Sequence, residues 1–290
     1  MDIENKKRKE YLSVAGLIFV GLVWGLGFPA LKVMSEAMPT FYIIALRFFI
    51  ASVLLSLFFF KRFSSINIKL LKSALILSFF LFFTYVFATV GIQYTTSAKA
   101  SFFCCLGVLI IPVISRLLFK VRITGRVFFC IFLCTVGLFF ISYTQGMGWH
   151  LSPGDILCLC CSVCGAFHVV FVGRLAKQQD VALLTIFQLF FISVFAAAAA
   201  FATEDFPAEL AAFDLAILMF LGIFCTAAAF LIQTASQRYI SPARVGVIFS
   251  IEPVSGAALS ALLLGDKLGV FGVIGGLLIV VSIIIMESGS

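Results

Sequence analysis

The strongest constraint in this sequence is a succession of apolar segments, each long enough to cross a lipid bilayer as a helix. Such a helix needs about 20 consecutive apolar residues. Hydrophobic residues make up 63% of the 290 positions and charged residues only 11%, which is too few to cover the surface of a water-soluble domain. The expected spans are residues 11–32, 39–60, 70–94, 96–118, 126–143, 154–174, 181–202, 211–237, 242–264 and 268–286.

The sequence therefore predicts an all-α integral membrane protein with ten transmembrane helices. The first apolar run follows a basic N-terminal segment, as in a signal peptide. It is too long for one, and no clean cleavage site follows, so we expect an uncleaved first span. The nine cysteines lie inside apolar runs, where a free thiol behaves as a small apolar side chain. A disulfide framework is therefore not expected.

The distribution of basic residues supports ten spans. With that number, 16 of the 20 Lys and Arg fall in the segments on one side of the membrane. Cytoplasmic segments carry such an excess, which predicts a multi-pass protein of the plasma membrane with both termini in the cytoplasm. The net charge of +7 then follows from topology, and no nucleic-acid partner is expected. The 16 residues are Lys6, Lys7, Arg8, Lys9, Lys61, Arg62, Lys69, Lys72, Arg116, Lys120, Arg122, Arg126, Arg174, Lys177, Arg238 and Arg244.

A weak internal repeat divides the chain into residues 1–144 and 153–287, with five spans in each part. Because five is an odd number, the second repeat must enter the membrane from the opposite face. Inverted repeats place a binding site near the midplane, where rocking of one half against the other gives alternating access. The aligned segments are 23–26 with 163–166, 45–48 with 186–189, and 93–100 with 238–245, at separations of 140, 141 and 145 residues.

Several motifs carry a resemblance to a known family. Residues 91–100 (GIQYTTSAKA), followed by Pro112, resemble the fourth-helix signature of EamA-type members of the drug/metabolite transporter superfamily. The matching stretch of a second EamA unit is found in residues 233–244 (QTASQRYISPAR), 248–254 (IFSIEPV) and 263–266 (LLGD). Trp24-Gly25 with Phe28, and residues 45–48, also fit this pattern. The chain departs from it at Pro29 and in the cysteine-rich sixth span.

The resemblance covers essentially the whole chain. It implies ten helices in two inverted five-helix repeats around a central cavity, in a family whose members typically export metabolites such as amino acids. We expect a secondary transporter that exports an amino acid or an amine-like metabolite by alternating access. A multi-substrate efflux carrier and a facilitative uniporter or channel stay open as alternatives, and a membrane enzyme is less favoured.

The expected partners are a small-molecule substrate and the lipid bilayer. No phosphate-binding loop occurs in the sequence, so ATP is not expected to drive transport directly. A proton is the candidate coupling ion. We expect no cofactor, and a monomer, since the ten-helix form of the family is self-sufficient.

Two charged residues, Arg47 and Glu252, lie deep inside predicted spans, away from their ends. Glu252 lies about eight residues into the ninth span, roughly 12 Å deep at 1.5 Å per residue, and Pro253 follows it. A carboxylate at this depth should face the protein interior or a watery cavity. Glu252 is a candidate ligand for a substrate ammonium group or a candidate proton-coupling site. A purely structural role for this acid is an equal alternative. Arg47 in the second span is a candidate anion ligand, although a structural role is favoured.

Six further residues are candidates for lining the cavity. His168 shares one helix face with two cysteines, Cys161 and Cys164. A cavity or interhelical hydrogen bond is favoured for His168 over a soft-metal site. Aromatic faces could hold a cation, although ordinary packing is the more frequent role of such rings. The other candidates are the aromatic residues Trp24, Phe28 and Tyr85 and the polar residues Thr226 and Gln233, for which interhelical hydrogen bonds are the alternative.

Overall fold

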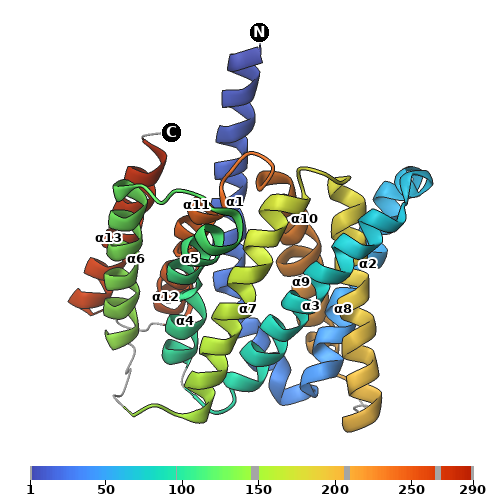
Figure 1. Ribbon diagram of the computed structural model, residues 1–290. Helices are drawn as coiled ribbons and strands as arrows, with labels where there is room; N and C mark the ends of the chain where they lie inside the picture. Colours follow the sequence, from blue (N-terminus) through green and yellow to red (C-terminus); the bar gives the residue numbers. More distant parts are fainter. Residues whose placement is uncertain (1, 96, 145–149, 206–209, 265–268, 289–290) are drawn as a thin grey trace.

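The computed structural model describes residues 2–95, 97–144, 150–205, 210–264 and 269–288, and within these ranges it contains helices and no strand (Figure 1). A 3-10 helix at Phe60–Ser65 follows α2, and a π-helical turn at Ile223–Ala228, here called the π turn, joins α9 to α10. The helices of the first half are α1 Asp2–Ala37, α2 Thr40–Phe59, α3 Ile68–Gly91, α4 Ser97–Cys105, α5 Gly107–Phe119 and α6 Gly125–Thr144. Those of the second half are α7 Pro153–Leu175, α8 Val181–Thr203, α9 Ala212–Gly222, α10 Ala229–Ser236, α11 Pro242–Phe249, α12 Ile251–Leu264 and α13 Val270–Glu287.

Within the described ranges, nine helical segments are long and apolar enough to cross a membrane. They coincide with nine of the ten expected spans, so the prediction of an all-α, multi-pass membrane protein is confirmed. The expected span at 242–264 is instead divided into α11 and α12, each shorter than a bilayer crossing. The count of ten spans stays a prediction.

Two helix breaks have the same backbone geometry. Leu106 separates α4 from α5, and Ser250 separates α11 from α12; both residues have φ −62° and ψ −8°. They are 144 residues apart in the sequence. Pro253 contributes to the second break because it has no N–H to donate to the carbonyl of Phe249. Broken helices are tolerated at membrane depth where protein covers them or where they line a cavity.

Short polar residues determine where several helices begin. The Asn67 side chain accepts a hydrogen bond of 2.9 Å from the Leu70 N–H at the start of α3. Ser152 and Asp155 form a capping box at the start of α7, with Pro153 in the first turn. These side chains satisfy backbone N–H groups that have no partner within the helix.

The longest helix interfaces join the two halves of the chain: α2 packs on α8, α3 on α7, α6 on α13 and α1 on α12. Small residues permit the last of these contacts. A Cβ atom on Gly25 of α1 would lie 1.8 Å from the Ser255 Oγ and 2.7 Å from the Glu252 carbonyl oxygen of α12. Figure 1 shows α1 beginning at the upper end of the bundle and α7 at the lower end.

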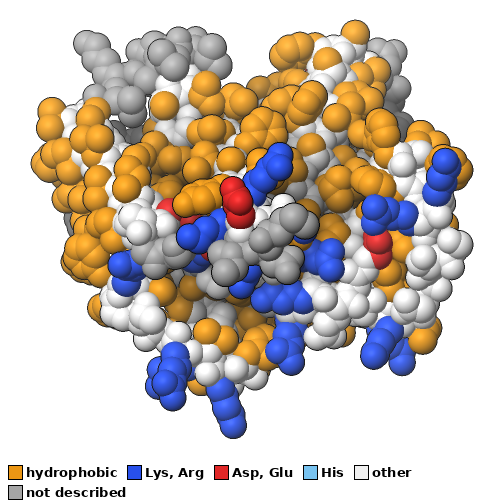
Figure 2. Space-filling model, turned by 90° about the horizontal axis from the view of Figure 1, so that it is seen from above, with side chains coloured by type: hydrophobic (Ala, Val, Ile, Leu, Met, Phe, Trp, Pro, Cys, Tyr) orange, Lys and Arg blue, Asp and Glu red, His pale blue; other side chains and the backbone are white. Residues whose placement is uncertain are grey.

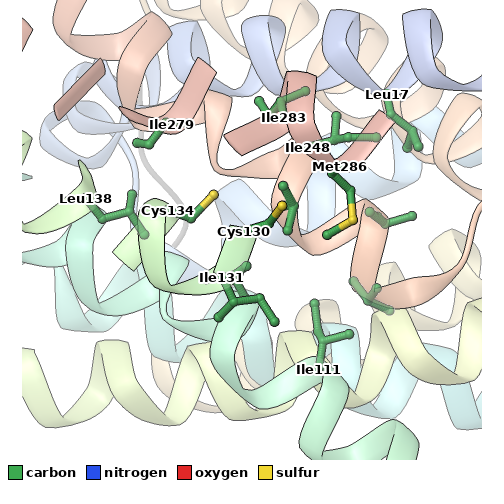
Figure 3. Close-up of a cluster of buried hydrophobic side chains, with 14 of the residues drawn as sticks. Leu17, Ile111, Cys130, Ile131, Cys134, Leu138, Ile248, Ile279, Ile283 and Met286 are labelled. Atoms are coloured by element: carbon green, nitrogen blue, oxygen red, sulfur yellow. The ribbon is translucent and has the colours of Figure 1, made fainter. Parts of the chain in front are cut away.

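The largest buried apolar cluster lies between α1, α5, α6, α7, α11 and α13 (Figure 3). Cys130 and Cys134 of α6 pack inside it as small side chains. The Ser282 hydroxyl donates a hydrogen bond of 2.8 Å to the Cys130 carbonyl oxygen, and the Cys134 thiol donates one of 3.2 Å to the Ser282 oxygen. All nine cysteines are free thiols.

Apolar and charged side chains lie on different parts of the molecular surface. Large apolar residues are exposed along the outside of the bundle, among them Phe58 at 74% and Phe201 at 80%, as expected for side chains that contact lipid. Figure 2 shows Lys and Arg side chains gathered over the end of the molecule seen from above, where both termini lie in Figure 1.

Candidate functional site

A cavity of about 220 Å³ lies between the two halves of the chain and receives side chains from both. The residues contributed by the first half are Trp24, Gly27, Leu31, Arg47, Leu81, Thr84, Tyr85, Ala88, Cys104, Cys105, Gly107, Val108 and Ile111. Those contributed by the second half are Cys161, Ser162, Gly165, Ala166, His168, Val169, Cys225, Phe230, Gln233, Gly246, Phe249, Ser250 and Glu252.

Arg47 brings a positive charge to this cavity from α2. Its side chain is only 4% exposed, and its guanidinium carbon lies 4.9 Å from the centre of the Tyr85 ring, a cation–π contact. The Nε–H donates a hydrogen bond of 3.0 Å to the Thr226 hydroxyl. Within the described residues, the two terminal nitrogens of Arg47 donate no hydrogen bond and form no ion pair.

The π turn holds two of the cavity side chains. Its Thr226 hydroxyl, which accepts from Arg47, donates to the carbonyl oxygen of Leu221 five residues earlier, at 2.8 Å. The neighbouring carbonyl, that of Cys225, accepts a hydrogen bond of 2.9 Å from the indole N–H of Trp24. A π turn displaces carbonyl groups from the regular helical ladder, and such turns are frequent at functional sites. Here they orient Trp24 and Arg47.

Glu252 brings a carboxyl group to the same cavity from the first turn of α12. Its backbone carbonyl accepts a hydrogen bond of 2.9 Å from the Ser255 hydroxyl. Its carboxylate forms no hydrogen bond or ion pair with any residue that the structure describes. Arg47 and Glu252 therefore share a cavity without pairing with each other.

His168 and Gln188 form a buried polar contact beside the cavity. The His168 side chain is 2% exposed and Gln188 is fully buried. The His168 Nε2–H donates to the Gln188 Oε1 at 3.1 Å, and the Gln188 amide donates to the Thr234 hydroxyl at 3.5 Å. His168 thus has an interhelical partner and also reaches the cavity. Among the described residues, no group of three or more His, Cys, Asp or Glu is arranged to hold a metal ion.

Gln233 is the third polar group in the cavity wall. Its amide nitrogen donates to the Gln237 Oε1 at 3.2 Å. Its Oε1 atom is buried and accepts no hydrogen bond from any residue that the structure describes. A buried acceptor without a partner costs free energy, so this oxygen is available to a donor on a bound molecule.

Aromatic rings form much of the remaining wall. The ring of Trp24 lies 4.9 Å from that of Phe249 and 5.6 Å from that of Phe230, measured between centroids. Phe230 in turn contacts the Tyr85 ring at 6.2 Å and the His168 ring at 6.0 Å. These faces suit an apolar group or a cation.

The structure brings together most of the site residues expected from the sequence. Trp24, Tyr85, His168, Gln233 and Glu252 line one cavity, together with Arg47. Thr226 is not among the lining residues and instead holds Arg47 in place. The side chain of Phe28 lies outside the part of the structure that is described.

The sequence did not single out three residues that lie in or beside the cavity wall. Phe230 and Phe249 stand in apolar runs with 36 phenylalanines in the chain, so no local signal distinguishes them. Gln188 carried a usable signal, because residues 186–189 align with 45–48 and place Gln188 opposite Arg47 in the repeat.

Comparisons with known proteins agree with this architecture. The chain is 30% identical over 280 residues to an "Uncharacterized transporter" of Archaeoglobus fulgidus, covering 96% of this chain and 87% of that protein. It is 25% identical over 294 residues to the "Uncharacterized transporter YetK" of Bacillus subtilis, covering 96% and 88%. A solved structure, titled only "Crystal structure of protein", has the same fold, with a TM-score of 0.78 at 17% identity and coverage of 94% and 97%.

The model of the EamA-like transporter family matches the chain twice, at residues 12–143 and 152–288. The two matches together span nearly the whole sequence and correspond to the two halves that enclose the cavity. The motifs at residues 91–100 and 233–244 fall inside them. The chain therefore belongs to the EamA-like transporter family, and so to the drug/metabolite transporter superfamily.

Proposed function

We propose that this transporter is a secondary carrier that exports a small metabolite, an amino acid or an amine-like molecule, by alternating access. The observation that carries the proposal is the presence of two groups that can bear opposite charges, Arg47 and Glu252, in one cavity without an ion-pair partner among the described residues. Charges inside a membrane protein are costly, and they usually mark the path of a substrate or ion. A ligand that supplies both counter-charges would remove that cost.

The polar groups of the cavity define complementary subsites. The terminal nitrogens of Arg47 can donate two parallel hydrogen bonds to a carboxylate. The Glu252 carboxylate and the free Gln233 Oε1 can accept hydrogen bonds from an ammonium group. Trp24, Phe230 and Phe249 then contact the rest of the molecule.

The size of the cavity agrees with a small substrate. Its volume is about 220 Å³, below the roughly 300–1,000 Å³ of pockets that hold drug-sized ligands. We therefore favour a metabolite of amino-acid size over a bulky multi-substrate efflux cargo.

Coupling to a proton is the simplest role for Glu252 in export. When the carboxylate binds either a proton or the substrate ammonium, but not both, inward proton movement is exchanged for outward substrate movement. The two half-cycles expose the cavity to opposite sides of the membrane, as in other carriers with internally repeated halves. We further propose that both termini lie in the cytoplasm of a plasma-membrane protein, and the Lys and Arg side chains gathered at the end that carries them (Figure 2) support this orientation.

The test is counterflow in proteoliposomes that contain the purified protein. Vesicles loaded with unlabelled amino acids, or with unlabelled amines, receive a trace of the labelled compound outside. A carrier accumulates label transiently and saturably, and Arg47→Gln and Glu252→Gln should both strongly reduce the accumulation at low substrate concentration. Flux that rises linearly with concentration would indicate a channel, and conversion of the labelled compound would indicate an enzyme.

A further inference from the structure

Two ion-pair networks lie at opposite ends of the bundle, and each joins the first half of the chain to the second. The network at the end remote from the termini connects α4 and α7. Its centre is Asp155, which is fully buried, and Lys99, which is 7% exposed. The Lys99 ammonium donates a hydrogen bond of 3.2 Å to the Asp155 carboxylate and another to the His150 carbonyl oxygen. The Thr95 hydroxyl also donates to Asp155.

The backbone is closely packed around this first network. A Cβ atom on Gly154 would lie 2.5 Å from the Gly91 carbonyl oxygen and 2.9 Å from the Thr95 backbone nitrogen. The start of α7 therefore rests directly on the connection between α3 and α4. No side chain larger than hydrogen fits at Gly154 while this contact exists, so the end of the bundle is closed there by contact between the two halves.

The second network lies at the end that carries the termini and connects α11 with α1 and α13. Arg244 in the first turn of α11 donates to both oxygens of the Glu287 carboxylate, with 3.1 Å from Nε to Oε1. One terminal nitrogen of Arg244 also donates to the Glu10 carboxylate of α1. The side chain of Arg244 is 15% exposed, and those of Glu10 and Glu287 are 28% and 20% exposed.

The cations of the two networks occupy equivalent positions in the aligned repeat. Residues 93–100 align with 238–245, which places Lys99 opposite Arg244 at a separation of 145 residues. Each cation pairs with an acid near the beginning of the first helix in the other half: Lys99 with Asp155 of α7, and Arg244 with Glu10 of α1. The four helices α1, α4, α7 and α11 also line the cavity. The networks therefore stand at the two ends of the same space.

We infer that the Lys99–Asp155 and Arg244–Glu10–Glu287 networks are the two gates of the transport cycle, which open in turn. Tilting one half against the other separates either α4 from α7 or α11 from α1. Each network crosses the interface that opens at its own end, so each stabilises the state in which that end is shut. Because both cannot open in one rigid tilt, the cavity stays closed on one side at a time. This inference rests on the proposed alternating-access function.

A third ion pair provides the matched control. Arg62 and Asp180 also join the two halves, with 2.7 Å between Nη1 and Oδ2. The Arg62 side chain is 53% exposed, and α8, which Asp180 caps, contributes no residue to the cavity wall as described. Loss of this Arg62–Asp180 ion pair should not change the balance between the state that is open at one end of the bundle and the state that is open at the other end.

Native cysteines make the test independent of any substrate. Cys104, Cys105, Cys161 and Cys225 line the cavity, so a membrane-impermeant maleimide reaches them only from the open side. Proteoliposomes with one orientation, established by protease cleavage of the N-terminal segment, are labelled from either face. Mass spectrometry then assigns the label to individual cysteines in wild type, Lys99→Gln, Arg244→Gln and Arg62→Gln.

Lys99→Gln should increase labelling of the cavity thiols from the face remote from the termini by about fivefold or more, a shift typical of coupled conformational equilibria. Arg244→Gln should do the same from the opposite face, and Arg62→Gln should match the wild type. Lys99→Arg, which retains the charge, should restore the wild-type rate. If a variant unfolds in thermal melting, Thr95→Val replaces Lys99→Gln and Glu10→Gln replaces Arg244→Gln.

Equal labelling of wild type and both gate variants would overturn the inference, as would an increase from the same face in both. A failure of the proposed transport function is recognised separately. In that case each gate variant still shows increased labelling of the cavity thiols from its predicted face, while no compound shows counterflow in the wild type.

Discussion

At the scale of single residues, the proposed function depends most on Glu252 and Arg47. Both are charged groups inside apolar helices, and both reach the cavity without forming an ion pair in the described structure. Arg47 is fixed by Thr226 and by the Tyr85 ring, whereas the Glu252 carboxylate has no such support. This asymmetry favours Arg47 as a stationary ligand and Glu252 as the group whose charge changes during the cycle.

Replacing Glu252 by Gln should lower the affinity for an ammonium-bearing substrate by roughly 10- to 100-fold, the effect of losing a charge-assisted hydrogen bond of about 1.5–3 kcal/mol. Transport by the variant should also lose its dependence on pH, because Gln cannot bind a proton. Counterflow between pH 5 and pH 8 measures both effects. Glu36→Gln, at an exposed acid of α1, is the control. A variant with full activity and an unchanged pH profile would exclude the coupling role.

Asp180 gives a prediction about stability outside the membrane spans. Partial burial alone would raise the pKa of Asp180, but hydrogen bonds from the Leu183 N–H and the Arg62 guanidinium outweigh burial and lower this pKa. The charged form therefore contributes stability at neutral pH, and this contribution is lost as the pH falls through the lowered pKa. Asp180→Asn keeps a capping acceptor but removes the charge. Its melting temperature should lie about 1–2 °C below wild type at pH 7, because a charge at a helix N-terminus contributes at most about 1 kcal/mol. The difference should shrink as the pH falls through the lowered pKa of Asp180, and a difference that does not shrink in acid would contradict the assignment.

Among the helical elements, the π turn has the clearest role in shaping the cavity. It interrupts the continuity of α9 and α10 at Ile223–Ala228 and thereby presents one carbonyl and one hydroxyl to cavity side chains. An uninterrupted α-helix would direct the Thr226 hydroxyl to the carbonyl four residues earlier rather than five. The geometry of this turn therefore governs the orientation of Arg47 and Trp24.

Thr226→Val should raise the KM of transport by about fivefold or more with little change in the maximal rate, since loss of one hydrogen bond to a charged group costs at least about 1 kcal/mol. Thr226→Ser retains the hydroxyl and should restore the wild-type KM. Thr185→Val is a matched control, because Thr185 is equally buried but bonds only to the Val181 carbonyl in its own helix. Equal effects of the two Val substitutions would assign Thr226 a purely structural role.

The interface between α1 and α12 depends on a glycine at one position. Gly25→Ala would place a methyl group 1.8 Å from the Ser255 Oγ, so the helices must separate, at a cost of about 1–3 kcal/mol. We expect a lower melting temperature in detergent and reduced transport. Gly125→Ala serves as control, because a Cβ atom there meets nothing within 4 Å. An unchanged melting temperature for Gly25→Ala would show that α1 and α12 can move apart freely.

For the molecule as a whole, the topology across the membrane is the property most open to direct measurement. The basic connectors gather at one end of the bundle with the two termini (Figures 1 and 2). Compartment-specific reporters fused after Ser65 and after Asp205 should report opposite sides of the membrane, with Ser65 in the cytoplasm. Reporters that place both sites in one compartment would refute the inverted arrangement of the two repeats.

The sequence alone was sufficient for the membrane class, the helical content and the family. Runs of apolar residues leave a chain no alternative to helices, because every backbone N–H and C=O must be bonded within the segment in lipid. The sequence also identified Glu252, Arg47 and His168, since a polar group in an apolar run is conspicuous. It predicted most helix ends to within a few residues, because Asn67, Pro153 and Pro242 act locally.

The tertiary structure decided what those residues contact. The contacts of the π turn and the positions of Phe230, Phe249 and Gln188 in or beside the cavity depend on neighbours far away in the sequence, for which a local pattern carries no information. The pairing of Lys99 with Asp155 and of Arg244 with Glu10 spans 56 and 234 residues. Such contacts exist only after the two halves have packed together, because only then do the ends of α4 and α7, and of α11 and α1, meet.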